Sequence, residues 1–374
     1  MARITLVSRN FPPLSGGMER LVHELFRGLV NNHQVRLLGP KGCEKFVSSG
    51  SGVSSTSVSP TLFFLFLTLL KGVFGGRGYG APEIVMGGSG LVGPVVILLA
   101  KLSGAKSVLL LHGLDIVVDS RIYQWFFVPL LKRADMVICN SKYTARLAID
   151  HGVNKDNVVI VNPGVDVHAE STPHDVAKRA LGLDGKKVLL SVGRLMPRKG
   201  LAEFITNSFV NLAADPGIVL LVVGVEPGSA LNRPKESVLA MIEATVEKHG
   251  IDGQVQLLGH TDDDELAVLY SAADVFVFPL IKINGDVEGF GMVAIEAAAH
   301  GTPTVAFDCG GVGDAVVNGV NGVLVDAANY AEFGSAIIRV VQSDMRDSAR
   351  EFASQFSWEN YGAQIERCID KVLT

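Results

Sequence analysis

Short apolar runs alternate with helix-length amphipathic segments along almost the whole chain. In the first half the predicted strands are Ile4–Ser8, Gln34–Leu38, Glu83–Met86, Ser107–Leu111, Met136–Cys139 and Val158–Val161. In the second half they are Lys187–Val192, Ile218–Val223, Val255–Leu258, Val275–Phe278 and Thr304–Phe307. These runs are rich in Val, Leu and Ile, as parallel strands are when helices cover both faces of their sheet. The pattern predicts an α/β protein with two doubly wound parallel sheets.

A polar turn, Asn162-Pro-Gly-Val-Asp166, separates the two predicted sheets. We therefore expect one domain at 1–166 and a second at 167–355. The segment 356–374 is expected to form a helix that crosses back to the first domain. Its apolar residues have helical spacing: Tyr361, Ile365, Cys368, Ile369 and Val372. The stretch Val47–Thr61, rich in Ser, Gly and Val, predicts a mobile loop.

The two halves of the chain carry opposite charge. Residues 1–160 contain 17 Lys and Arg against 9 Asp and Glu, a balance of +8, whereas residues 161–374 contain 16 against 29, a balance of −13. The basic half has no nucleic-acid-binding motif. We expect its partner to be an anionic membrane surface or a phosphorylated lipid rather than nucleic acid.

Several features predict a cytoplasmic protein. The four cysteines form neither a CxxC motif nor a Cys/His cluster, so neither a zinc site nor a disulfide framework is expected. The first ten residues predict a strand and a polar loop instead of a signal peptide. The longest apolar run, Leu62–Leu70, is far shorter than the ~20 residues that span a bilayer.

The segment Thr61–Phe74 permits two interpretations. It is strongly apolar, contains four phenylalanines, and has Lys71 and Arg77 near its end. A helix of this kind can lie in the membrane interface, which would dock the protein on the inner face of the cytoplasmic membrane. The same segment can also be an ordinary buried helix on a Rossmann-like sheet.

Two features of the first half are candidates for ligand binding. Gly16 and Gly17 precede an amphipathic helix, where free backbone N–H groups and the helix dipole favour an anion such as a diphosphate. The alternative is a plain Pro-Gly turn. His112 directly follows an apolar strand, at the edge where open α/β sheets bind ligands. The alternative there is a structural histidine.

In the second half, a strand runs into Gly193-Arg194, and Lys199 follows five residues later. Two cations at the end of a strand suit a diphosphate leaving group, whose negative charge grows as the bond breaks. The alternative, two solvated surface cations, is disfavoured by the adjoining apolar strand and glycines.

The segment from Gly285 to Gly301 contains the most specific pattern. A helix is predicted to begin near Gly291 and to end before Gly301. Glu288 then lies in the preceding loop and Glu296 inside the helix, so that the two carboxylates can bind hydroxyls at two ends of one ligand. The amides of Phe290, Gly291 and Met292 crown the helix N-terminus. Glu296 is flanked by core-type residues and needs a buried partner.

An acidic run, Thr261-Asp-Asp-Asp-Glu265, invites interpretation as a metal site. Thr261 and Asp264 have the spacing of a capping box, and acidic residues at a helix start complement the dipole. We therefore predict a helix start and no metal site.

Together these motifs resemble glycosyltransferase family 4, retaining enzymes of the GT-B fold. The resemblance also includes Pro13-Leu-Ser-Gly-Gly-Met-Glu19, Asn162–Asp166 and the closing Trp358-Glu359 helix. It implies that the first domain binds the acceptor and the second the nucleotide-sugar donor. Gly17, Arg194 and Lys199 would then hold the diphosphate. His112, Glu288 and the amides of Phe290–Met292 would hold the sugar, Glu296 the ribose, and the turn Leu258-Gly-His260 the base.

The resemblance implies a metal-independent reaction that retains the anomeric configuration, with no cofactor besides the nucleotide-sugar substrate. The residues of the motifs around Arg194 and Glu288 resemble those of bacterial phosphatidylinositol mannosyltransferases and O-antigen mannosyl- or rhamnosyltransferases. This favours a GDP-sugar over a UDP-sugar and a lipid-linked or glycan acceptor in cell-envelope synthesis. Asn10 stands where the lipid mannosyltransferases often have an acidic residue, which leaves the acceptor open.

Three alternatives differ in class: a nucleotide-sugar epimerase of the same shape, a UDP-sugar-dependent transferase with a soluble acceptor, and a silent scaffold subunit. A scaffold would not need to keep Arg194, Lys199 and Glu288, and all three are present. An epimerase interconverts a sugar and transfers none, so a transfer assay separates it from the transferases.

Overall fold

The computed structural model describes residues 1–47, 52–75, 79–167, 172–226 and 236–374. The chain forms two compact units: unit 1 comprises Met1–Gly164 and Trp358–Thr374, and unit 2 comprises Val165–Ser357. The chain leaves unit 1 two residues before the boundary that the polar turn suggested, and returns at Trp358. Each unit is a parallel sheet covered by helices, which confirms the predicted α/β fold class with two Rossmann-like domains.

Unit 1 contains a seven-stranded parallel sheet in the order β3-β2-β1-β4-β5-β6-β7. Alternate residues of its central strands enter two separate cores: Ile4 and Leu6 pack with α1, whereas Val7 packs with the cluster around α2 and α3. The strands are β1 (Arg3–Val7), β2 (Gln34–Pro40), β3 (Gly52–Thr56), β4 (Ile84–Gly87), β5 (Lys106–Leu111), β6 (Met136–Cys139) and β7 (Val158–Ile160).

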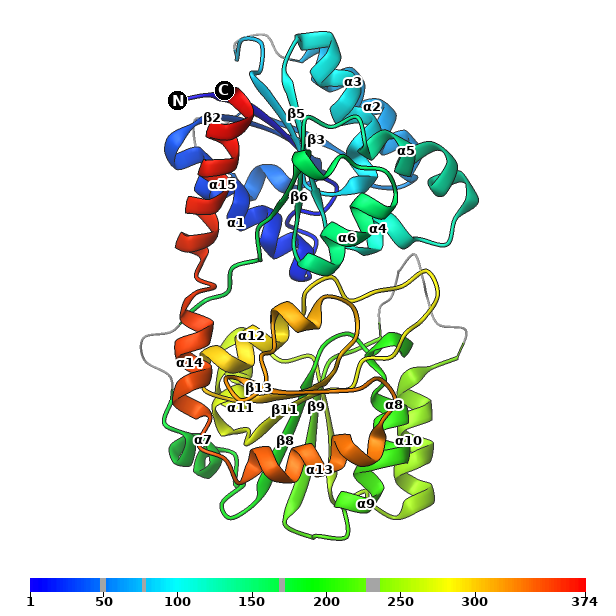
Figure 1. Cartoon of the computed structure of the whole chain (residues 1–374), viewed down its shortest axis with the longest axis vertical. Helices are drawn as coiled ribbons and strands as arrows, with labels where there is room; N and C mark the ends of the chain where they lie inside the picture. The colour runs from blue at the N-terminus through cyan, green and yellow to red at the C-terminus, as the bar shows by residue number, and fades with distance from the viewer. Residues whose placement is uncertain (48–51, 76–78, 168–171, 227–235) are drawn as a thin grey trace. The chain divides into compact units, whose positions relative to one another are not determined.

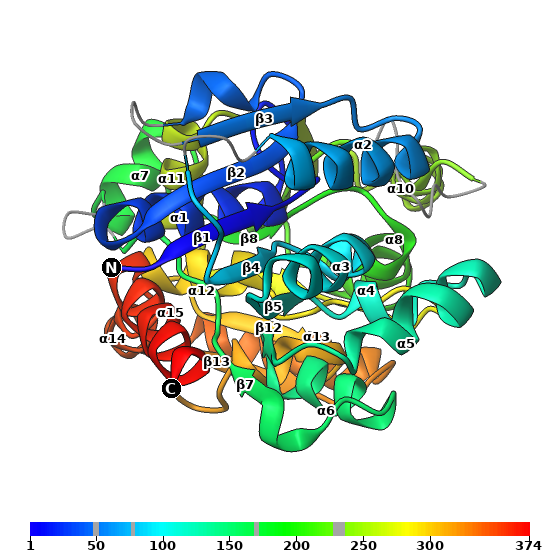
Figure 2. The ribbon, with the colours of Figure 1, turned by 90° about the horizontal axis from the view of Figure 1, so that it is seen from above.

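Helices cover both faces of this sheet, as Figures 1 and 2 show. The longer ones are α1 (Gly17–Asn32), α2 (Thr61–Phe74), α3 (Gly93–Ser103), α6 (Lys142–Asp150) and α15 (Trp358–Leu373). Shorter turns are η1 (Cys43–Phe46), η2 (Gly90–Val92), α4 (Leu114–Val117), the π-helical η3 (Tyr123–Phe127), α5 (Val128–Leu131) and η4 (Lys155–Asn157). In α15, Tyr361 and Ile365 are buried in the same core as Leu21 and Leu25 of α1. The C-terminal helix is therefore part of unit 1.

Two strands were not foreseen. The prediction of a loop over Val47–Thr61 is wrong for Gly52–Thr56, which forms the edge strand β3, while residues 48–51 lie outside the described ranges. An edge strand pairs with one neighbour only, so Ser and Thr suffice where a central strand needs Val and Ile. The other strand, β13 (Gly322–Val325), lies at an edge of the second sheet.

Unit 2 contains a six-stranded parallel sheet in the order β10-β9-β8-β11-β12-β13. The strands other than β13 are β8 (Lys187–Val192), β9 (Ile218–Val223), β10 (Val255–Gly259), β11 (Val275–Phe278) and β12 (Thr304–Phe307). Its helices and turns are α7 (His174–Ala180), η5 (Pro197–Lys199), α8 (Leu201–Phe204), the π-helical η6 (Ile205–Phe209), α9 (Val210–Leu212), α10 (Val238–His249), α11 (Asp263–Ala272), α12 (Met292–Ala299), η7 (Gly310–Asp314), α13 (Tyr330–Val341) and α14 (Arg346–Ser354).

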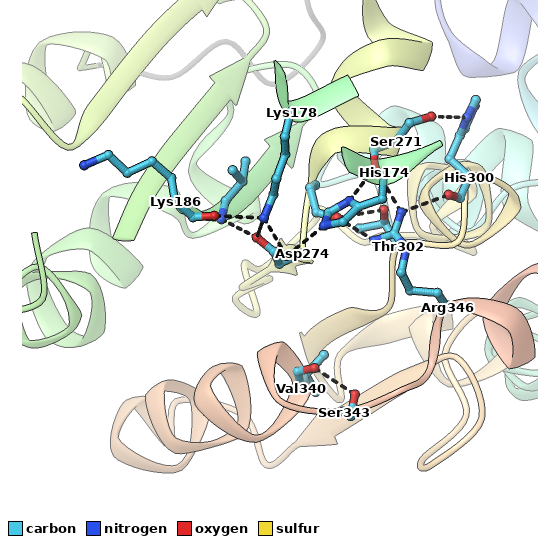
Figure 3. A network of polar contacts seen from close by, with 12 residues as sticks. His174, Lys178, Lys186, Ser271, Asp274, His300, Thr302, Val340, Ser343 and Arg346 are labelled. Atoms are coloured by element: carbon cyan, nitrogen blue, oxygen red, sulfur yellow. Dashed lines mark hydrogen bonds and ion pairs between the residues drawn. The ribbon is translucent and has the colours of Figure 1, made fainter. Parts of the chain in front are cut away.

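A polar network fixes the amino ends of β8 and β11 beside each other (Figure 3). Asp274, directly before β11, accepts hydrogen bonds from Lys178 Nζ at 2.7 Å and from the Val188 N–H at 2.6 Å. His174 Nε2 lies 3.1 Å from the same carboxylate. Burial opposes ionisation of Asp274, but the bonds from His174 and Lys178 outweigh it and lower the pKa of Asp274. The ionised carboxylate thus anchors α7 and the register of the two strands.

Candidate active site

The loops after β8 and β11 meet at the carboxyl ends of neighbouring strands. The strand order reverses here, because β9 lies on one side of β8 and β11 on the other. Ligands of open α/β sheets bind at such switch points. The Ile281 N–H donates to the Arg198 carbonyl at 3.0 Å, so the two loops are in contact. Gly200 adopts φ 63°, and a Cβ there would come within 1.9 Å of the Pro279 carbonyl oxygen, so only glycine permits this approach.

An ion cluster joins these two loops. Glu288 Oε2 accepts a hydrogen bond from Lys199 Nζ at 2.8 Å and another from Arg198 Nη1. Arg198 also reaches Asp286, with its Nε 3.1 Å from Oδ1. The four side chains are mostly buried, at 8–17% exposure. The Gly311 N–H, from the loop after β12, donates to the Glu288 carbonyl at 2.8 Å and fixes its backbone.

The cluster controls the ionisation of its members. Burial by itself raises the pKa of Glu288, but Lys199 and Arg198 outweigh burial and lower that pKa to about 2. Burial lowers the pKa of Lys199; Glu288 opposes this effect, while Arg198 and Arg194 add to it. The Lys199 ammonium also lies 4.7 Å from the centre of the Phe278 ring, a cation–π contact. Glu288 is therefore a carboxylate at neutral pH.

Arg194 is exposed at the end of β8. Its charge acts on Lys199, yet within the described part of the chain no hydrogen bond or ion pair holds its guanidinium. The two cations predicted as a pair thus differ: Lys199 is bound to a carboxylate, and Arg194 has its donors available.

The Gly-Phe-Gly segment forms the start of α12 as predicted. Gly291 is the N-cap residue at φ 99°, and α12 ends before Gly301, which has φ 77°. As a glycine, this N-cap residue has no side chain to cap the first turn. Phe290 is buried in the core at 2% exposure, whereas Met292 is half-buried. A backbone-lined N-terminus without a side-chain cap is suited to an anion or to sugar hydroxyls.

Glu296 lies on α12, and its environment explains how a carboxylate fits there. The Tyr270 hydroxyl of α11 donates to Glu296 Oε2 at 3.1 Å, and the Tyr270 ring stacks on His300 with centroids 5.6 Å apart. The expected buried partner is thus present.

The turn predicted to hold the base lies at the end of β10. Leu258 is half-buried against the core and His260 is exposed. Gly259 adopts φ 69°, and its carbonyl accepts a hydrogen bond from the Gly224 N–H at 2.7 Å. The acidic run nearby starts α11, but its cap is Asp262, whose side chain accepts from the Glu265 N–H at 2.8 Å. The predicted capping role of Thr261 is therefore wrong by one residue.

In unit 1, Gly16 and Gly17 lie at the N-terminus of the sixteen-residue α1, as predicted. A carboxylate of the same chain is already close: a Cβ on Gly16 would lie 2.5 Å from Glu19 Oε2. Asn10 Nδ2 donates to Glu19 Oε1 at 2.7 Å and orients it. An anion bound at this helix N-terminus would have to displace Glu19, which the sequence analysis did not consider.

His112 lies at the carboxyl end of β5 and is 7% exposed. Its Nε2 is 2.8 Å from the Gly88 carbonyl oxygen. A carbonyl oxygen only accepts, so this contact places a proton on Nε2. Asp115 Oδ2 accepts from the Gly90 N–H at 2.9 Å and from the His112 N–H at 3.3 Å, which holds the loop.

Two family models match the chain: glycosyl transferases group 1 over residues 174–356 and glycosyltransferase family 4 over residues 15–169. The D-inositol 3-phosphate glycosyltransferase of Geodermatophilus obscurus is 35% identical over 240 residues, which cover 62% of this chain and 51% of the relative. The chain thus spans about half the length of the curated relatives that it matches.

Solved structures match over the full length. Anabaena HepE, solved in complex with UDP, has a TM-score of 0.80 at 21% identity, covering 99% of this chain and 100% of that one. Sucrose-phosphate synthase from Thermosynechococcus elongatus has a TM-score of 0.79 at 24% identity, covering 100% and 99%. These likenesses establish the fold. The two family models, which match successive parts of the chain, show that it belongs to glycosyltransferase family 4, and the solved structures show that it has the GT-B fold.

Proposed function

We propose that the protein is a retaining hexosyltransferase that moves a hexose from a nucleoside diphosphate sugar to a lipid-linked or glycan acceptor. The ion cluster at the switch point supports this proposal most directly. It places Arg198 and Lys199 beside Glu288, and the charge of the exposed Arg194 also acts on Lys199. The cations can bind a diphosphate and the carboxylate can accept from a sugar hydroxyl, all within the loops after β8 and β11.

In this proposal Arg194 and Lys199 bind the diphosphate, together with the amides at Gly16 and Gly17 once Glu19 has moved away from them. Charge builds on the leaving phosphate as the glycosidic bond breaks, so cations favour the transition state over the ground state. Lys199 exchanges part of its contact with Glu288 for the phosphate, and Arg194 supplies donors that no side chain in the described ranges occupies.

The sugar is held by Glu288, by the Phe290–Met292 amides and by His112. Glu288 accepts from hydroxyl groups because it stays ionised at neutral pH. Glu296 binds the ribose hydroxyls, and the turn Leu258-Gly-His260 contacts the base.

For retention we propose attack on the same face as the leaving group, without a covalent intermediate on Glu288. A carboxylate that two cations hold is a weak nucleophile, because attack would expose those cations without a partner. We therefore assign deprotonation of the acceptor to the departing diphosphate, on the same face as the leaving group.

The charge of the diphosphate is met by side-chain cations and helix N-termini, so we propose that no divalent metal is required. In the described ranges no group of three or more His, Cys, Asp or Glu is placed to hold a metal ion.

We also propose which base the donor carries and which class of acceptor receives the sugar. The resemblance of the motif residues to mannosyl- and rhamnosyltransferases favours a GDP-sugar, whereas HepE was solved with UDP. The basic first half favours a phosphorylated acceptor, lipid-linked and used in cell-envelope synthesis at the inner membrane face. A phosphorylated cyclitol is the second candidate, because the relatives at 31–35% identity are named for D-inositol 3-phosphate.

One assay tests these proposals together. The protein is incubated with GDP- and UDP-hexoses and with either a polyprenyl-phosphate-linked sugar or inositol phosphate, and NMR determines the anomer formed. Transfer with retained configuration supports the proposal. Interconversion of the sugar nucleotide without transfer to any acceptor would show an epimerase instead.

A further inference from the structure

Three large apolar side chains project from one short turn of unit 1. Ile122, Trp125 and Phe126, in and beside η3, are 69%, 79% and 67% exposed. Single exposed apolar residues are ordinary on protein surfaces. Three within five residues, two of them aromatic, mark a surface that binds something.

The turn that carries them is firmly anchored. Tyr123 is buried and stacks on Phe127, with ring centroids 4.9 Å apart and planes 11° from parallel. Gln124 Nε2 donates to the carbonyls of Ile116 and Val118 at 2.8 and 2.9 Å. Trp125 and Phe126 are therefore exposed on a turn that packing and hydrogen bonds hold in place.

The neighbouring helices extend the same surface. The buried sides of α2, α3 and α5 enter one core cluster, so these helices cover the same face of the unit 1 sheet (Figure 2). Their outer sides carry further exposed apolar residues: Leu62, Phe63, Phe66, Phe74, Leu98 and Leu102. In α2 only Phe64, Leu65 and Thr68 are buried. One face of α2 is therefore buried and the other exposed: Phe64 lies in the core, whereas Phe63, Phe66 and Phe74 lie on the surface.

Basic residues outnumber acidic ones in the segments that form this layer. Residues 61–75, 90–106 and 118–133, which form this layer, contain one acidic residue, Asp119. They contain six basic residues: Lys71, Lys101, Lys106, Arg121, Lys132 and Arg133. A protein partner would require a complementary acidic patch, whereas an anionic bilayer supplies negative headgroups above an apolar interior.

We propose that this layer, formed by α2, α3 and η3 with α5, is a docking surface for an anionic lipid bilayer. Trp125 and Phe126 enter the headgroup region, where aromatic rings are favoured, and the lysines and arginines bind anionic headgroups. In the described part of the chain no helix is long and apolar enough to cross a membrane. The surface requires neither donor nor acceptor and goes beyond the proposed transfer reaction.

Flotation with vesicles tests the docking surface without any substrate. The full chain is mixed at low salt with vesicles of phosphatidylcholine alone or with phosphatidylglycerol added. We expect flotation with the anionic vesicles only, and release at high salt. The double variant Trp125→Ser, Phe126→Ser should bind at least tenfold more weakly, as should Lys132→Glu, Arg133→Glu. The matched control Val176→Ser, Met241→Ser, which changes exposed apolar residues of unit 2, should float like the parent.

A second measurement covers the possibility that a variant fails to fold. The chain has two tryptophans, so Trp358→Phe leaves Trp125 as the sole fluorescent reporter. Its emission should shift to the blue with anionic vesicles and be quenched by brominated lipid. Unchanged emission, equal flotation with neutral vesicles, or a lipid-free dimer that the Trp125→Ser, Phe126→Ser variant abolishes would each overturn the proposal. Because no sugar is transferred in these tests, their outcome is independent of the proposed enzyme activity.

Discussion

Glu288 Oε2 lies 2.8 Å from Lys199 Nζ, although 89 residues separate them in the sequence. The sequence patterns suggested a phosphate-binding role for one and a sugar-binding role for the other, yet the structure places them in direct contact. Residues that share an ion cluster have coupled energetics, so substitutions at these two positions are expected to be non-additive. A diphosphate that binds Lys199, as we propose, would have to rearrange this pair.

The first prediction concerns the two cations after β8. Arg194→Ala and Lys199→Ala should each lower kcat by about 10²-fold or more, because each removes stabilisation of charge that develops in the transition state. Steady-state transfer assays measure the effect, with Arg179→Ala as control, since Arg179 pairs with Asp175 on the surface of α7. Near-parent turnover in a folded Arg194→Ala, Lys199→Ala double variant would remove both residues from the mechanism.

The second prediction separates the two glutamates. Glu288→Gln should lower kcat with little loss of affinity for the free nucleoside diphosphate, because Glu288 is assigned to the sugar. Glu296→Gln should instead weaken nucleotide binding through the ribose. Calorimetric titration with the nucleoside diphosphate, beside transfer kinetics, tests both. The opposite pattern would show that the roles have been exchanged.

The main architecture could be predicted because its signals are local. Buried parallel strands are apolar runs, and the start and end of α12 follow from Gly291 and Gly301. The strand β3 was missed because an edge strand of Ser and Thr has no such signal. The N-cap of α11 was predicted one residue too early, because Thr261 with Asp264 and Asp262 with Glu265 have the same three-residue spacing.

The pairing inside the site could not be predicted. Arg198 stands next to Lys199 in the sequence, and nothing there distinguishes it from a solvated surface cation. Its role depends on Asp286 and Glu288 in a loop 90 residues away, which only the strand order β8-β11 brings near. Glu19 beside Gly16 has a local signal that could have been used, because an acidic residue in the first turn of a helix is a common partner of its N-terminus.

The third prediction follows from Arg198. Because its guanidinium bridges Asp286 and Glu288, Arg198→Ala should displace Glu288 and lower kcat, with little change in nucleotide affinity. Arg198→Lys should restore little, since an ammonium cannot reproduce the two-sided contact. Parent-like kcat in both variants would show that Arg198 has no positioning role.

The fourth prediction is that transfer proceeds without a divalent metal, since cations and helix N-termini meet the phosphate charge. Protein treated with excess EDTA should keep its parent rate. Loss of activity that magnesium or manganese restores would contradict the proposal, provided that the chelated protein keeps its unfolding temperature.

The last prediction uses the pH dependence of Lys199. Burial and the charges of Arg198 and Arg194 lower the pKa of Lys199, whereas Glu288 raises it. Glu288→Gln removes the raising contribution, so the ammonium should lose its proton at a lower pH than in the parent. If protonated Lys199 binds the diphosphate, the alkaline limb of the kcat/KM profile moves to lower pH in this variant. Glu296→Gln makes the same chemical change on the neighbouring helix and should leave that limb in place, because Glu296 is hydrogen-bonded to the Tyr270 hydroxyl, whereas Lys199 is hydrogen-bonded to Glu288. An alkaline limb at the same pH in parent and Glu288→Gln would show that Lys199 ionisation does not control the reaction.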